Sequence, residues 1–175
     1  MARKYFQNLP VVEYRGGKVR NLLLSAHIVK DVLDNAQAYY PYTLKDGETP
    51  TSIAFDYYGS VEYVWLVLMS NGMIDPYTDW HKSTQNFNSY LEDKYGSVTA
   101  AMATIDHYQH ATDPTYPFLS PTSYQYLSDA DKASFVAVTA YDYENELNES
   151  KRQIKLIDNR FAARIAHELE VKLNG

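Results

Sequence analysis

Cysteine is missing from this chain of 175 residues, and so is any long apolar run. Without cysteine there can be no disulfide-stapled scaffold, no thiolate zinc site and no thiol nucleophile. The longest apolar run, residues 64–69, is far shorter than the ~20 residues that cross a bilayer. Arg3 and Lys4 are not followed by an apolar stretch, so we expect no signal peptide. These absences predict a protein without a membrane partner.

Recognisable catalytic motifs are also missing. The sequence has no Gly-x-Ser-x-Gly elbow and no glycine-rich phosphate loop. Carboxylate pairs such as Glu144 with Glu146, or Asp75 with Asp79, could serve a sugar-cleaving enzyme, but nothing around them distinguishes them from other acidic residues. We therefore predict no catalytic residue and a chain that is not an enzyme.

Histidine is the remaining candidate for metal binding. His107 and His110 lie between Asp106 and Asp113, and on a helix their imidazoles would share one face. The glutamate and the spacing of a zincin motif are absent, so a surface polar cluster is the stronger interpretation. We predict no metal site and no cofactor.

Charge and tyrosine are unevenly distributed along the chain. The net charge is −6; residues 1–30 carry six basic groups and one acidic group, residues 151–175 carry six and three, and the middle is strongly acidic. An acidic middle repels phosphate, so nucleic acid is not expected as a partner. Six of the 17 tyrosines lie in residues 39–63 and four in residues 108–126. Tyrosine buries area and keeps a hydroxyl, which favours protein contact surfaces.

The N-terminal part predicts a hairpin followed by a helix. Gly16 and Gly17 can supply the positive φ angles of a tight turn between extended segments at 11–15 and 18–24. Apolar residues then recur at helical spacing over residues 26–38. An isolated hairpin is marginally stable in water, so we expect this one to lie on the rest of the chain or on a partner.

Two capped helices are predicted next. After a short strand at 42–44, Thr49 is a favourable N-cap and Gly59 a favourable C-terminal glycine. Ser60 can cap a second helix over residues 61–70, which is apolar on nearly every side. A helix of this kind is buried on both faces, against its own domain and against something else.

The middle of the chain predicts a third helix and an irregular connection. This helix is capped by Ser83 or Thr84 and ends at Gly96, and residues 100–108 continue as helix or strand. Three prolines interrupt residues 109–127. This segment is therefore predicted to be the main boundary of the chain.

The C-terminal part predicts a hairpin and a last helix. Residues 135–141 and 151–157 are expected to pair as strands around a turn at 144–150. Asp158 caps the final helix, whose apolar stripe is Phe161, Ala162, Ile165, Ala166, Leu169 and Leu173.

Residues 42–72 contain four short turn and helix motifs in sequence: Gly47-Glu48-Thr49, Ile53-Ala54, Tyr58-Gly59 and Asn71-Gly72. This order resembles a LysM domain, and the resemblance implies a small strand-helix-helix-strand unit. The chain departs from the family after Asn71-Gly72, where Asp75-Pro76 replaces the usual polar turn and closing strand. The second helix is also unusually apolar. Both departures favour a docking module over sugar binding.

Peptidoglycan binding is the alternative interpretation of this segment. In a LysM domain a shallow groove holds N-acetyl sugars, and the matching positions here are Glu48, Thr49, Thr51, Asn71 and Gly72. A lone wall-binding module would not need the rest of the chain, which carries no catalytic motif.

Further segments carry a resemblance over nearly the full length: Tyr5-Phe6-x-x-Leu9-Pro10, residues 63–68, residues 93–97 and residues 148–158. Together with the LysM-like core, they resemble the small baseplate wedge proteins of contractile-tailed, T-even-like bacteriophages. The resemblance implies a non-catalytic subunit of the virion tail baseplate, assembled in the host cytoplasm. It also implies a role in clamping neighbouring wedge subunits together in a hetero-oligomeric assembly.

The resulting prediction is an α+β fold with a small LysM-like βααβ core, an extended N-terminal arm and hairpin, and a C-terminal β-hairpin plus helix. The predicted segments are 1–41 (arm, hairpin and helix), 42–82 (LysM-like domain), 83–127 (connecting region) and 128–175 (hairpin and helix). Apolar residues on and after the second helix are predicted to contact partner subunits: Val61, Val64, Trp65, Leu68, Met73, Ile74 and Trp80.

Overall fold

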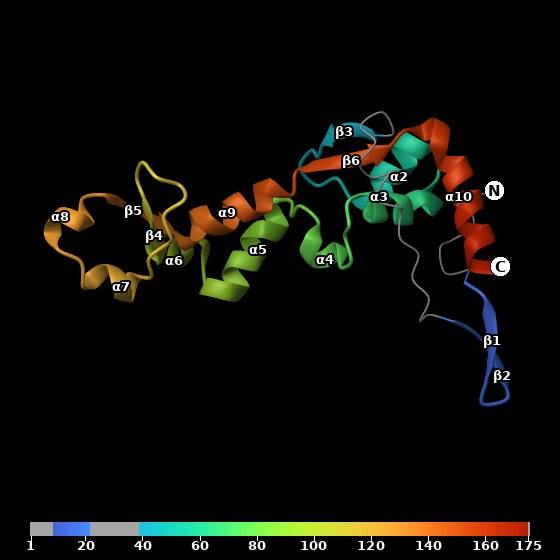
Figure 1. Cartoon of the computed structure of the whole chain (residues 1–175), viewed down its shortest axis with the longest axis horizontal. Helices are drawn as coiled ribbons and strands as arrows, with labels where there is room; N and C mark the ends of the chain where they lie inside the picture. Colours follow the sequence, from blue (N-terminus) through green and yellow to red (C-terminus); the bar gives the residue numbers. More distant parts are fainter. Residues whose placement is uncertain (1–8, 22–38, 175) are drawn as a thin grey trace. The chain divides into compact units, whose positions relative to one another are not determined.

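The computed structural model describes residues 9–21 and 39–174 and divides the chain into two compact units (Figure 1). The first unit comprises residues 1–80 and 152–175, and the second comprises residues 81–151. Both mix helices with antiparallel strands, which confirms the predicted α+β class. The helix predicted over 26–38 lies outside the described residues.

An N-terminal hairpin is present, with its turn one residue earlier than predicted. Strand β1 (Val11–Tyr14) pairs with β2 (Gly17–Arg20), and Tyr14 lies opposite Gly17. The turn residues are therefore Arg15 and Gly16, with φ of 52° and 78°, as a primed two-residue turn requires. Gly17 belongs to the second strand. Every residue of both strands is exposed.

The two predicted helices of the first unit are confirmed. Thr49 and Ser52 form a reciprocal capping box at the start of one helix, and Gly59 ends it in the left-handed conformation with φ of 76°. Ser60 caps the short helical turn that leads into the next helix. The elements are α2 (Pro50–Tyr58), η3 (Val61–Tyr63), α3 (Val64–Ser70) and α4 (Pro76–Asp79).

The strand that closes the first unit comes from the far end of the chain. Strand β3 (Tyr39–Thr43) pairs antiparallel with β6 (Gln153–Ile157), from Tyr39 opposite Ile157 to Thr43 opposite Gln153. From β3 the chain passes through α2, η3, α3 and α4, and the whole second unit is inserted before the closing strand β6. In Figure 1 these strands lie side by side next to α2 and α3.

The predicted C-terminal hairpin is wrong. Residues 153–157 pair with β3, and β5 (Phe135–Thr139) pairs with β4 (Ile105–His110). The predicted turn at 144–150 belongs to helix α9 (Ala140–Ser150), whose N-cap Thr139 accepts a hydrogen bond from the backbone N–H of Asp142. This helix buries one face at four-residue spacing, through Ala140, Glu144 and Asn148.

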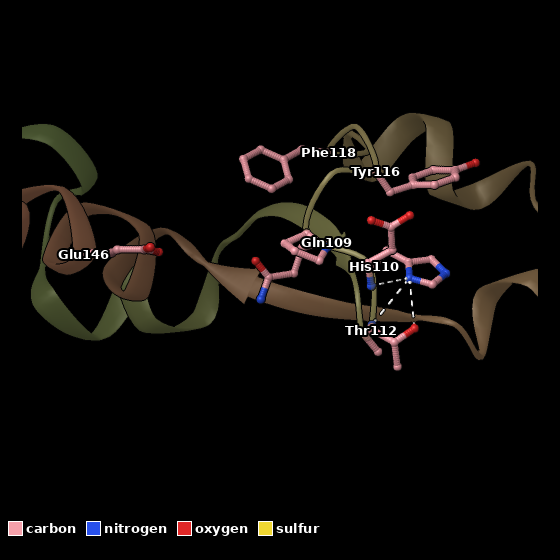
Figure 2. Close-up of a pocket in the computed structure, with 9 residues that line it drawn as sticks. Gln109, His110, Thr112, Tyr116, Phe118 and Glu146 are labelled. Atoms are coloured by element: carbon pink, nitrogen blue, oxygen red, sulfur yellow. Dashed lines mark hydrogen bonds between the residues drawn. The ribbon is translucent and has the colours of Figure 1, made fainter.

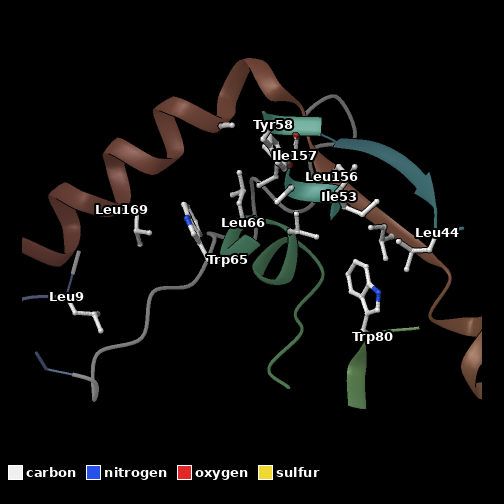
Figure 3. Packing of buried hydrophobic residues seen from close by; sticks show 14 residues of the cluster. Leu9, Leu44, Ile53, Tyr58, Trp65, Leu66, Trp80, Leu156, Ile157 and Leu169 are labelled. Atoms are coloured by element: carbon white, nitrogen blue, oxygen red, sulfur yellow. Dashed lines mark hydrogen bonds between the residues drawn. The ribbon is translucent and has the colours of Figure 1, made fainter. Parts of the chain in front are cut away.

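The core of the first unit joins its helices to β6 and to the last helix, α10 (Asn159–Asn174). Leu66 and Leu156 are fully buried, and the Tyr58 hydroxyl donates to the Ile157 carbonyl at 2.9 Å (Figure 3). Of the predicted stripe on α10, Ala162 and Leu169 are buried, and Phe161, Ile165 and Ala166 pack at the margin of the core. The side chain of Leu173 lies outside the described residues.

The second unit has its own small core of Phe87, Leu91 and Ala101. The predicted caps Ser83 and Gly96 bound its first helix. The proline-containing segment 109–127 lies inside this unit, so the compact units group the chain differently from the four predicted segments. The remaining elements are α5 (Thr84–Tyr95), α6 (Val98–Ala103), α7 (Pro121–Gln125) and α8 (Asp129–Lys132).

Candidate interaction surfaces

Most of the apolar residues predicted to contact partners lie in or beside the core of the first unit. Trp65 and Trp80 are buried, and Val64, Leu68 and Met73 are half-buried. The Trp80 indole N–H donates to the Glu48 carbonyl at 2.8 Å. Helix α3 contacts both α2 and β6. Its all-round apolar character is therefore largely explained by burial within its own unit.

Two of the predicted contact residues do face solvent. The side chain of Ile74 is 94% exposed, and that of Val61 is 48% exposed. Tyr77, three residues after Ile74, was not predicted as a contact residue and is 88% exposed.

The turn that carries Ile74 and Tyr77 is closed by its own carboxylates. Asp79 Oδ2 accepts hydrogen bonds from the backbone N–H groups of Ile74 and Asp75, both at 2.9 Å. Asp75 Oδ1 accepts from the Tyr77 N–H at 3.0 Å. The turn thus holds a large aliphatic and a large aromatic side chain in water. The sequence signal for it was Asp75-Pro76 followed by Asp79, a capped turn with two large apolar residues around it.

The residues of the alternative sugar groove are largely engaged within the chain. The Glu48 carboxylate accepts from the Tyr42 hydroxyl and from the Lys45 N–H, both at 2.8 Å. Burial, and then this hydrogen bond to Glu48, raise the pKa of Tyr42 to about 12. Thr49 is committed to the capping box, whereas Thr51 is exposed on the first turn of α2.

Asn71 and Gly72 connect α3 to the closing strand. Asn71 Nδ2 donates to the Lys155 carbonyl at 2.9 Å, and the Lys155 N–H donates to Asn71 Oδ1 at 2.8 Å. Asn71 Nδ2 also donates to the Val67 carbonyl at 2.8 Å, and Gly72 has φ of 65°. This pair of residues therefore ends the helix and holds β6 in place.

A buried carboxylate ties two helices of the second unit together. Glu144 on α9 accepts hydrogen bonds from the Tyr90 hydroxyl, the Lys94 ammonium and the Tyr95 hydroxyl of α5. Burial alone would raise the pKa of Glu144, but Lys94 and the two hydroxyls lower it below its ordinary value. Glu146 is exposed, so the carboxylate pair considered from the sequence has one member enclosed and one in solvent.

The histidines lie on a strand, so the helical arrangement considered for them does not occur. His107 Nδ1 is 2.8 Å from Asp106 Oδ2, and its ring stacks on Phe118. His110 Nδ1 accepts from the Asp113 N–H at 3.1 Å. Over residues 9–21 and 39–174, no three His, Asp or Glu side chains group closely enough to hold a metal ion.

A pocket of about 350 Å³ lies in the second unit, in the region predicted to be irregular (Figure 2). Residues from β4, the loop after it and α9 form its lining: Gln109, His110, Ala111, Thr112, Asp113, Pro114, Tyr116, Phe118 and Glu146. No motif in the sequence links residues 109–118 to Glu146, so this pocket could not be predicted.

Exposed apolar side chains on both units are typical of proteins that work through contacts with other proteins. They include Ile74 and Tyr77 on the first unit and Phe118 and Tyr126 on the second. No helix in the described part of the chain has both the length and the apolar character to cross a membrane.

Comparison with known proteins makes that class specific. Residues 7–126 match the family described as "Base plate wedge protein 53". The chain is also 28% identical over 141 residues to the "Baseplate wedge protein gp53" of Enterobacteria phage T4. The aligned region covers 73% of this chain and 71% of the phage T4 protein. The chain therefore belongs to the base plate wedge protein 53 family. It is a non-catalytic structural protein of the phage tail baseplate in the virion.

Proposed function

We propose that this subunit clamps neighbouring wedge subunits together by contacting them through both of its compact units. The observation that carries the proposal is that each unit has its own core and its own exposed apolar side chains. Ile74 and Tyr77 are 94% and 88% exposed on the first unit, and Tyr126 is 85% exposed on the second. Large apolar side chains of this exposure are typical of interface anchors.

The N-terminal hairpin supports the same role. An isolated two-stranded hairpin is marginal in water, and both strands of this one are exposed throughout. Val11 and Tyr14 are 51% and 59% exposed. A partner that covers the hairpin would bury these side chains, and the basic residues Arg15, Lys18 and Arg20 suit an acidic partner surface.

We further propose that the first unit is a LysM-like scaffold whose closing strand is displaced to the end of the chain. Its order of β3, α2, α3 and β6 is the strand-helix-helix-strand order of that fold. The engagement of Glu48, Thr49 and Asn71 within the chain favours a structural use of this scaffold over sugar binding.

Reconstitution with the other wedge subunits of the same phage tests the clamp. One variant carries Ile74→Asp and Tyr77→Ser, and a second carries Phe118→Ser and Tyr126→Ser. Each is expected to lose binding to a different neighbour, because the substituted residues belong to different units. Glu92→Gln, an exposed substitution on α5, is the matched control and should bind as the unaltered chain does.

Two outcomes would contradict the proposal. In the first, both double variants assemble with every neighbour as well as the control does. In the second, the chain ignores the wedge subunits and is retained on purified peptidoglycan, which would favour the sugar-binding alternative.

A further inference from the structure

The pocket of the second unit has aromatic walls that are held in place by histidines. The Phe118 ring stacks on His107 with 4.2 Å between ring centroids, and the Tyr116 ring stacks on His110 at 5.3 Å. Phe118 remains 60% exposed and Tyr116 46% exposed. Figure 2 shows both rings at the pocket together with His110 and Gln109. Rings fixed before a ligand arrives lose little freedom when it binds.

Two carboxylates, those of Asp113 and Glu146, also line this pocket. Asp113 Oδ1 accepts from the Thr115 N–H at 2.9 Å and from the Thr115 hydroxyl at 2.6 Å. These bonds lower the pKa of Asp113, so its carboxyl group is charged at neutral pH. Both of these bonds are made by Oδ1 of Asp113, and the side chain of Glu146 is exposed.

Acidic residues outnumber basic ones around the pocket. Among the residues that the structure describes, those that line the pocket include no lysine and no arginine. The second unit as a whole has ten acidic residues against four basic ones. One of the four, Lys94, is already paired with Glu144. A pocket of this composition complements a cationic ligand.

We propose that this pocket binds the guanidinium group of an arginine presented by a neighbouring protein. A guanidinium is planar and weakly hydrated, so it stacks on aromatic rings while its N–H groups reach carboxylates. An ammonium group uses flat walls less well, because it is a compact and strongly hydrated charge. That the arginine comes from an adjoining subunit rests on the proposed function, because the clamp places neighbouring subunits against this unit.

The ligand preference is tested on the full chain by NMR titration. The probe is N-acetyl-arginine methylamide, and the amide signals of residues 109–118 are followed. We expect saturable shifts, with weaker binding of the citrulline and lysine analogues. Glu146→Gln and Asp113→Asn should each weaken binding about twofold to fivefold, and the control Glu92→Gln should not. Absent shifts, equal shifts with citrulline, equally tight lysine binding or an unchanged affinity in Glu146→Gln would each overturn the proposal.

The protein source is tested by placing Asp113→Asn and Glu146→Gln together in the reconstitution with wedge subunits. We expect weaker association with the neighbour that contacts the second unit. If the double variant assembles normally while the Ile74→Asp/Tyr77→Ser variant and the Phe118→Ser/Tyr126→Ser variant each still lose a neighbour, this inference fails and the clamp stands. If the arginine probe binds but no wedge subunit does, the clamp fails and the guanidinium preference of the pocket stands.

Discussion

The side chain of Asn71 bonds both backbone polar groups of Lys155, a residue on the strand that closes the first unit. The two distances are 2.9 Å to the carbonyl and 2.8 Å from the N–H. Lys155 lies opposite Pro41 of β3, which has no N–H to donate. The alternation of an antiparallel ladder directs the Lys155 backbone groups away from β3. The Asn71 amide therefore satisfies the two backbone groups of Lys155 that a third strand would otherwise pair with.

Asn71→Ala should therefore destabilise the first unit. The substitution removes the two bonds to Lys155 and the bond to the Val67 carbonyl. We expect the free energy of unfolding to fall by about 1–2 kcal/mol, measured by urea denaturation followed by circular dichroism. Asn88→Ala is the matched control, because Asn88 is exposed on α5 and alanine is the better helix former. Equal effects of the two substitutions would refute this role for Asn71.

The sequence located Asn71-Gly72 as a helix stop but could not show what its amide binds. Helix caps and stops are local, so Thr49, Gly59 and Gly96 were predicted correctly, and Ser83 is the cap of the two alternatives, Ser83 or Thr84. Strand partners are not local. The alternation in residues 153–157 indicates a strand but carries no information about which strand it joins, and the nearest candidate was the wrong one.

The candidate surfaces, too, could be predicted only in part from the sequence. Ile74 was predicted as a contact residue and is exposed, whereas Trp65 and Trp80 were predicted as contact residues and are buried. An apolar side chain looks the same in the sequence whether it fills a core or faces a partner. The pocket was not predicted because Glu146, one of its lining residues, lies on helix α9, whereas the sequence predicted a turn at residues 144–150.

The bonds of Glu144 to α5 predict a pH-dependent contribution to stability. The pKa of Glu144 is depressed in the folded chain, so its contribution is present above the ordinary glutamate pKa and is lost as the pH falls through the folded value. At pH 7, Glu144→Gln should lower the free energy of unfolding by about 1–3 kcal/mol, because it removes the charge that faces Lys94.

The measurement is urea denaturation of the unaltered chain and of Glu144→Gln at neutral pH and below about pH 4, where an ordinary glutamate protonates. The difference between the two proteins should shrink in acid. Glu92→Gln, with an exposed side chain on α5, should show little difference at either pH. A gap that stays constant with pH would show that the charge of Glu144 does not matter.

Trp80 contributes to the first unit through both its ring and its N–H. It is 6% exposed, and its indole nitrogen donates to the Glu48 carbonyl. Trp80→Phe keeps a ring but removes the donor, and should cost about 1 kcal/mol. Trp80→Ala removes the ring as well and should cost about 3–5 kcal/mol. Thermal and urea unfolding measure both, and a similar cost for the two variants would mean that the ring itself is not well packed.

The inserted position of the second unit predicts that the first unit folds without it. Both ends of the insertion meet the same turn of the first unit. Trp80 donates to the Glu48 carbonyl, and the Arg152 carbonyl accepts from the Leu44 N–H at 2.9 Å. A short glycine-serine linker in place of residues 81–151 should therefore allow β6 to pair with β3. We expect dispersed amide signals by NMR and one cooperative unfolding transition.

The matched control for this deletion ends the chain at Trp80, so that it also lacks β6 and α10. It should be unfolded, because Leu156 and Ile157 are fully buried in the core of the first unit and the Tyr58 hydroxyl has its acceptor on Ile157. If the linked chain were as unfolded as the truncated one, the first unit would depend on the second for its stability, and the clamp would have to act as one cooperative body. If both folded, β6 would not be the closing strand.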